Sequence, residues 1–194
     1  FRAALAVISA MLLSLLIGPW IINWLKKISI TQQIRDDGPQ SHLRKTGTPT
    51  MGGIIIIVCI LLSMLMWGDM GNKYIWIMLL SLVGYGGIGL LDDYLKVIRK
   101  NPKGLRAWYK FGAQIILALI IGVVLYVNPN DPFRSVLIVP FFKQWLLELG
   151  WFYIPFSILV IVGSSNAVNL TDGIDGLAIG LIGVASLANM ILVY

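Results

Sequence analysis

Long apolar stretches separated by polar connections organise the whole chain. Each approaches the roughly 20 residues that a helix needs to cross the hydrocarbon core of a bilayer, and none contains a charged residue. The stretches are Ala3–Trp24, Met51–Trp67, Tyr74–Leu91, Phe111–Val127, Trp151–Val162 continuing toward Leu170, and Leu177–Tyr194. The pattern predicts an all-α, polytopic transmembrane helix bundle of six spans, with residues 1–194 forming a single integral membrane domain.

Composition agrees with this class. The chain is 58% hydrophobic and only 12% charged, whereas a soluble domain carries about 25% charged residues. Its net charge of +6 is not spread evenly, because most of the basic residues fall in two connections, Lys26–Thr50 and Asp92–Lys110. The positive-inside rule places these connections in the cytoplasm and both chain ends outside. Such clustering is typical of membrane topology, so we expect no nucleic-acid partner.

Smaller features refine the picture. The single cysteine, Cys59, excludes an internal disulfide framework. The glycines at 84–89 and the Gly176/Gly180 pair predict close approach of helices. Between the fourth and fifth stretches, in a connection predicted to lie outside the cell, Lys143–Gly150 predicts a short helix at the membrane interface. Because the chain stops at Tyr194 inside an apolar stretch, we expect a piece of a longer protein, truncated at its C-terminal end.

Two adjacent carboxylates, Asp92 and Asp93, end the third apolar stretch. If the helix continues past Leu91, Lys96 lies four residues after Asp92 and three after Asp93, which places opposite charges on one face. Lys100 follows one turn later. Such a strip of acidic and basic groups at a membrane border suits a metal or a phosphate-handling reaction. The alternative is an ordinary solvated helix end with local ion pairs.

A second polar cluster, NAVNLTDGIDG, lies between the fifth and sixth stretches. Asn166, Asn169 and Asp172 recur every three residues, so a helix would align them on one face. Gly173 would let the backbone turn, and Asp175 would cap the sixth span. The alternative is a polar turn with a capped helix.

The third cluster, residues 35–53, mixes basic groups, hydroxyls and glycines before the second span. Lys45 and Thr50 are candidates to meet phosphate or a polar head group; the alternative is a flexible, positively charged loop.

Charge is absent from the spans and gathers at one predicted surface. This favours chemistry at the cytosolic leaflet over passage through the membrane, where charged groups at mid-span are expected.

Three stretches, DDGPQSHLRKTGTPTMGG, GLLDDYLKVIRKNPKGL and NAVNLTDGIDGLA, together resemble the N-terminal portion of bacterial phospho-N-acetylmuramoyl-pentapeptide transferases. These MraY-type enzymes belong to the polyprenyl-phosphate N-acetylhexosamine-1-phosphate transferases. The resemblance implies transfer of phospho-MurNAc-pentapeptide from UDP-MurNAc-pentapeptide to undecaprenyl phosphate, which forms lipid I and UMP in peptidoglycan synthesis. It also implies a bacterial cytoplasmic membrane location with the active site facing the cytoplasm, Mg²⁺ as cofactor, and a homodimer.

The resemblance also assigns roles to residues of this chain. It implies that Asp92 and Asp93 are catalytic and that Lys96 and Lys100 hold phosphates. The other implied substrate-binding and nucleotide-binding residues are Lys45, Thr50, Asn166, Asn169, Asp172, Gly173, Ile174 and Asp175. Asp92 or Asp172 would contribute to the metal site.

One departure and two alternatives accompany this hypothesis. The family's later aspartate, expected as the main Mg²⁺ ligand, and its histidine-rich loop do not occur in this sequence, so we expect the chain alone to be inactive. A related UDP-GlcNAc:undecaprenyl-phosphate phosphotransferase is the nearest alternative. A lipid transporter subunit is an alternative from another class, although no internal repeat supports it.

Overall fold

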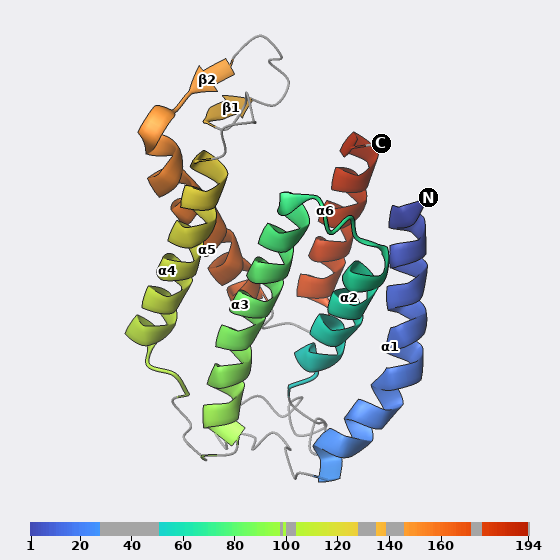
Figure 1. Cartoon of the computed structure of the whole chain (residues 1–194). Coiled ribbons are helices and arrows are strands. Elements are labelled where there is room, and N and C mark those ends of the chain that lie inside the picture. The colour runs from blue at the N-terminus through green and yellow to red at the C-terminus, as the bar shows by residue number, and fades with distance from the viewer. Residues whose placement is uncertain are drawn as a thin grey trace. The chain divides into compact units, whose positions relative to one another are not determined.

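Six α-helices dominate the computed structural model (Figure 1), which describes residues 1–27, 51–97, 99, 104–127, 135–138, 146–171 and 176–193. The helices are α1 (Arg2–Lys27), α2 (Gly53–Trp67), α3 (Lys73–Val97), α4 (Ala107–Tyr126), α5 (Tyr153–Thr171) and α6 (Leu177–Val193). A short hairpin, β1 (Val136–Ile138) and β2 (Leu146–Glu148), and a 3₁₀ turn, η2 (Gly150–Phe152), precede α5.

Four of the helices are long and apolar enough to cross a membrane, namely α1, α3, α4 and the segment that combines η2 with α5. The apolar helices α2 and α6 are shorter. The prediction of an all-α membrane helix bundle with six helices is therefore confirmed, and the chain fits a multi-pass membrane protein.

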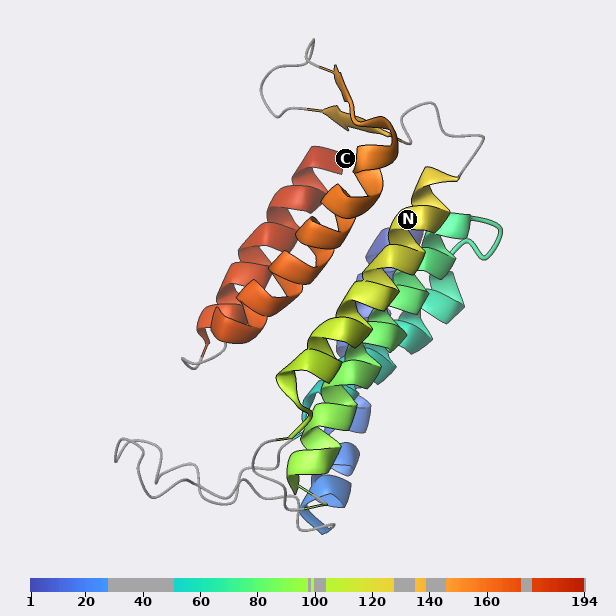
Figure 2. The same cartoon turned by 90° about the vertical axis from the view of Figure 1, so that its left-hand side faces the viewer.

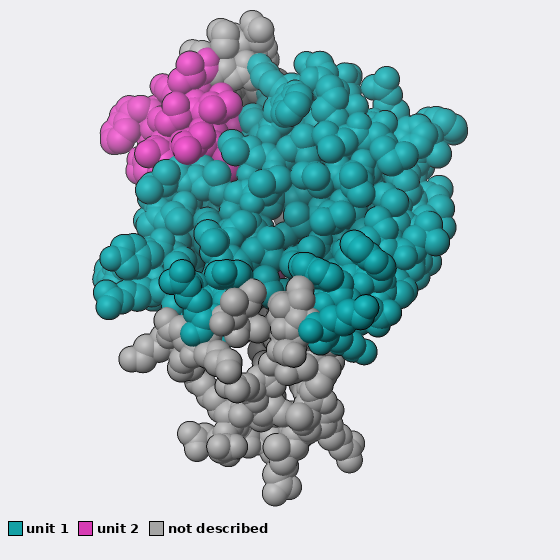
Figure 3. Space-filling model, turned by 60° about the horizontal axis from the view of Figure 1, so that its bottom comes forward, with its two compact units in different colours: residues 1–117 teal, residues 118–194 magenta. Residues whose placement is uncertain are grey.

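The chain divides into two compact units, coloured separately in Figure 3. Unit 1 comprises Phe1–Leu117 and unit 2 comprises Ala118–Tyr194. Unit 1 holds α1, α2, α3 and the first half of α4. Unit 2 holds the rest of α4, the hairpin, α5 and α6. That residues 1–194 form one domain stays a prediction.

In unit 1, α1 packs beside α2 along an apolar seam that also holds polar contacts of Ser63. Ile21 and Leu25 of α1 are buried, and Ile54 and Ile55 at the start of α2 pack against them. Near the other end of the seam, the Ser63 hydroxyl of α2 donates to the Ala6 carbonyl of α1. Interhelical hydrogen bonds of this kind help apolar helices associate in a bilayer, where no hydrophobic driving force acts between them.

Glycines bring α3 close to both of its neighbours in unit 1. A Cβ built on Gly86 would lie 2.6 Å from Ile57 Cδ1 of α2, and one on Gly84 would collide with Leu117 of α4. Close approach is thus confirmed at these two positions. At the Gly176/Gly180 pair, a Cβ on either glycine has no heavy atom within 4 Å in the described part of the chain. The prediction of close approach is therefore not confirmed for this pair.

Unit 2 corrects one expectation from the sequence. The helix predicted over Lys143–Gly150 is wrong, because Leu146–Glu148 forms β2, which pairs antiparallel with β1 so that Val136 faces Glu148. The Leu149 N–H then donates to the Ser135 carbonyl at 2.8 Å. Pairing with an apolar, β-branched segment overrides local helix preference. Beyond the hairpin, α5 and α6 pack side by side (Figure 2).

Candidate phosphate-handling site at the end of α3

Helix α3 continues past the apolar stretch to Val97 and carries both aspartates on its last turns. The predicted spacing is therefore confirmed, because Lys96 lies one helical turn after Asp92 and pairs with it. Asp92 is 7% exposed, which is unusual for a carboxylate unless it has partners. Asp93 is partly buried, and Lys96 is exposed.

The Asp92 carboxylate has a donor at each oxygen. Lys96 Nζ donates to Oδ2 at 2.8 Å, and the backbone N–H of Leu105 donates to Oδ1 at 2.9 Å. A second ammonium group, Lys110 Nζ of α4, lies 3.6 Å from Oδ2. Two cations and an amide thus converge on one buried carboxylate, an arrangement that satisfies its charge and fixes its plane.

Lys110 is a site residue that the sequence did not single out. The sequence shows it only as one of several basic residues in the connection Asp92–Lys110. It comes from α4, eighteen positions beyond Asp92. A short connection between two helices makes them antiparallel neighbours, and this is the signal that could have found it. Along the same pair of helices, the Tyr85 hydroxyl of α3 donates to the Gln114 carbonyl of α4 at 3.1 Å.

Asp93 has a different environment from its neighbour. It lies in the electrostatic field of Lys96 and Lys110, but it makes no hydrogen bond or ion pair with another described residue. Adjacent positions on a helix project about 100° apart, which explains why Lys96 and Leu105 reach only Asp92. The two carboxylates are therefore suited to different tasks.

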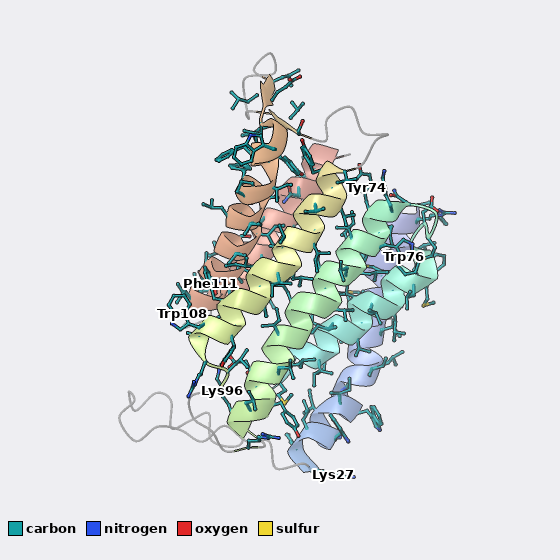
Figure 4. The ribbon with its side chains drawn as sticks, turned by 60° about the vertical axis from the view of Figure 1, so that its left-hand side comes forward. Lys27, Tyr74, Trp76, Lys96, Trp108 and Phe111 are labelled. Carbon is teal, nitrogen blue, oxygen red and sulfur yellow. The ribbon has the colours of Figure 1, made fainter. Side chains whose placement is uncertain are left out.

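Basic and aromatic side chains gather at the same end of unit 1. In Figure 4, Lys96 lies toward the end of the helices that carries Lys27, and Tyr74 and Trp76 lie at the opposite end. Trp108, 85% exposed, and Phe111 occupy the first turns of α4. Exposed aromatic rings beside basic groups are typical of the border between hydrocarbon and lipid headgroups.

In unit 2, α5 carries the two predicted asparagines. They lie three residues apart on one helix, as the spacing predicted, and the Asn166 side chain donates to the Val162 carbonyl at 2.8 Å. Asn169 is exposed. Helix α5 ends at Thr171, and Gly176 with a φ of +82° precedes α6. The other predicted site residues, Lys45, Thr50, Lys100, Asp172, Gly173, Ile174 and Asp175, lie outside the described residues.

Comparison with known proteins gives this geometry its context. Residues 75–194 match the glycosyl transferase family 4. The chain belongs to this family. The matched region runs from α3 to the end of the chain, so Asp92, Asp93, Lys96, Lys110 and both asparagines lie in the family 4 part, whereas Lys45 and Thr50 precede it.

Several curated relatives align with all 194 residues. The phospho-N-acetylmuramoyl-pentapeptide-transferase of Thermodesulfovibrio yellowstonii is 58% identical, and the protein of the same name from Citrifermentans bemidjiense is 50% identical. The alignments cover 100% of this chain and 54% of each relative, so the chain spans about half the length of the curated relatives it matches. The resemblance seen in the three motifs is confirmed.

The family resemblance implies Mg²⁺, whose binding requires several oxygen ligands in one place. No three His, Cys, Asp or Glu side chains gather anywhere in the described ranges. Both Asp92 oxygens already accept hydrogen bonds from nitrogen donors, one of them cationic, whereas Mg²⁺ needs oxygen ligands in octahedral geometry. The described residues of this family 4 chain therefore do not form a magnesium site by themselves.

Proposed function

We propose that the protein transfers phospho-MurNAc-pentapeptide from UDP-MurNAc-pentapeptide to undecaprenyl phosphate, which yields lipid I and UMP. The main support is the whole-chain alignment at 58% identity with an enzyme named phospho-N-acetylmuramoyl-pentapeptide-transferase. The convergence of Lys96 and Lys110 on Asp92 supports it from the residues upward. Such an activity supplies the cell with the first lipid-linked precursor of peptidoglycan, on which cell shape and division depend.

In this proposal the two lysines bind phosphate groups. Lys96 and Lys110 come from different helices, and the Asp92 carboxylate holds their ammonium groups close together. A pair of adjacent cations attracts both the anionic lipid and the soluble donor. Asp92 would act mainly by keeping the pair in place, since its own oxygens are already occupied by donors.

Asp93 is the carboxylate that we assign to the reacting atoms. It carries no hydrogen bond from another described residue, so its oxygens remain able to accept a proton from the lipid phosphate or to orient that group. An oxygen of undecaprenyl phosphate would form a bond to the sugar-bearing phosphorus of the donor. The bond from that phosphorus to the bridging oxygen would break, and UMP would leave with its electron pair.

The remaining site residues belong to the same proposal. Asn166, Asn169 and Asp172 would contact the donor near its ribose and the metal, and Lys45, Thr50, Gly173, Ile174 and Asp175 would contact the nucleotide. Lys100 would add a phosphate contact. Mg²⁺, when bound, would neutralise the pyrophosphate. Asp172 is the candidate ligand that the proposal keeps for it, because both Asp92 oxygens already accept hydrogen bonds from nitrogen donors, and other ligands would come from beyond the described residues.

Orientation and assembly follow from the same reasoning. We propose a cytoplasmic face at the Asp92 end of unit 1, because the described basic residues gather there while only Arg2 and Lys73 lie at the other end of these helices. The site would then face the soluble donor and the headgroup of the lipid acceptor. A homodimer is proposed from the family resemblance.

A donor-choice assay tests the function. The protein, expressed from its own gene in membranes, receives undecaprenyl phosphate with either UDP-MurNAc-pentapeptide or UDP-GlcNAc, and UMP release and the lipid product are measured. We expect UMP and lipid I from the first donor only. Product from UDP-GlcNAc alone would favour the related phosphotransferase, and transbilayer movement of lipid without UMP release would favour a transporter.

A further inference from the structure

The connection that leads into α4 brings its backbone directly against the Asp92 carboxylate. Gly104 is buried and has a φ of +58°, a conformation that residues with a Cβ seldom adopt. The next residue, Leu105, donates its N–H to Asp92 Oδ1 at 2.9 Å. A buried carboxylate on one helix is thereby held by the backbone that begins the next.

A side chain at position 104 would enter space that Asp92 and Lys96 occupy. A Cβ built on Gly104 would collide with Asp92 Oδ1 and would lie 2.6 Å from Lys96 Cε and 3.0 Å from Lys96 Cγ. Each of these atoms belongs to a side chain and not to the backbone. The helices can therefore keep their positions while the carboxylate and the lysine are displaced.

We propose that Gly104 is a positioning residue for the transfer reaction. Its lack of a side chain lets the Leu105 N–H hold the Asp92 carboxylate, and the carboxylate in turn keeps Lys96 and Lys110 together. Gly104 itself touches no substrate in this scheme. The inference rests on the proposed function and deepens it, because it names the backbone element that sets the geometry of the phosphate-binding pair.

The decisive variant is Gly104→Ala in the protein expressed from its own gene. We expect kcat for UMP release to fall about 100-fold, since a displacement of about 1 Å in a positioned group costs that much. KM for the soluble donor should change less than kcat, because both lysines keep their charge, and the thermal midpoint in detergent should fall only slightly, by the strain of alanine at a positive φ. Gly112→Ala in α4 is the matched control, because a Cβ there meets no heavy atom within 4 Å in the described part.

Gly104→Asn separates positioning from simple turn formation. Asparagine tolerates the left-handed conformation better than alanine does, yet it carries the same Cβ. We expect its kcat to be as low as that of Gly104→Ala. Two results would assign Gly104 to the fold and overturn the inference. One is recovery of activity in Gly104→Asn. The other is failure of both variants to insert into the membrane, with a large fall in their thermal midpoints.

The same assay keeps the two proposals apart. If the wild-type protein released no UMP from either donor, the proposed function would fail. If the wild-type protein and Gly104→Ala were equally active, only the positioning role would fail.

Discussion

The two ends of unit 1 both pair carboxylates with basic side chains, yet they do so in different ways. At one end, Arg2 and Asp69 lie 3.7 Å apart, and their side chains are 70% and 65% exposed. At the other end, the Asp92 side chain is only 10% exposed and meets Lys96 at 2.8 Å, Lys110 at 3.6 Å and a backbone N–H.

This difference shows how environment gives a charge its role. An exposed ion pair is screened by water and salt and contributes about 0–1 kcal/mol. A buried carboxylate with several donors holds them in fixed positions, and removing it leaves those donors without a partner. The first arrangement suits a surface, whereas the second suits a site where the placement of charge matters for the reaction.

The largest effect is expected from the aspartates. Asp93→Asn should lower UMP release by a factor of about 10² to 10⁴, because it removes the proposed acid–base group, and Asp92→Asn should also reduce it strongly by releasing the two lysines. Asp69→Asn, at the opposite end of unit 1, is the control and should remain active. Near-normal transfer by both site variants would contradict the assignment of this end as the site.

A smaller loss of activity is expected from Lys110→Met, which keeps the length of the side chain and removes its charge. If Lys110 binds phosphate, kcat/KM should fall about tenfold or more, since a charge-assisted contact contributes about 1.5–3 kcal/mol. Lys73→Met, at the other end of α3, serves as the control in the same assay. Equal activity of the two variants would remove Lys110 from the site.

The polar contact between α1 and α2 should affect stability and not activity. Ser63→Ala removes the hydroxyl that donates to the Ala6 carbonyl and lies 3.0 Å from the Ser9 hydroxyl. We expect the free energy of unfolding in detergent to fall by about 1 kcal/mol. Ser14→Ala is matched to it, because the Ser14 hydroxyl is exposed and donates within its own helix to Met11. Similar losses in the two variants would argue against a role in helix packing.

The smallest effect is expected at the exposed pair. Arg2→Ala should change the free energy of unfolding by no more than about 0.5 kcal/mol, and raising the salt concentration should reduce that difference further. Thermal unfolding at low and high salt provides the measurement. A loss as large as that of Ser63→Ala would show that the two ends of unit 1 differ less than their exposure implies.

Local periodicity was enough to predict much of this molecule. The apolar stretches determined the helices, because a helix in lipid satisfies its own backbone hydrogen bonds and needs only length and apolar side chains. The contact between Asp92 and Lys96 was likewise predictable, since four positions along a helix bring two side chains to one face. The asparagines at 166 and 169 share α5 for the same local reason.

What the sequence left undecided depends on contacts between residues far apart along the chain. Local preference suggested a helix over Lys143–Gly150, but pairing with Val136–Ile138 made residues 146–148 a strand. Lys110 and the Leu105 N–H reach Asp92 only because α4 returns alongside α3 through a turn at Gly104. The sequence by itself determined where the six long apolar stretches form helices and which charges neighbour one another along them. The tertiary structure decided which of the two aspartates became buried among donors and which remained available, because burial and convergence depend on how separate helices pack.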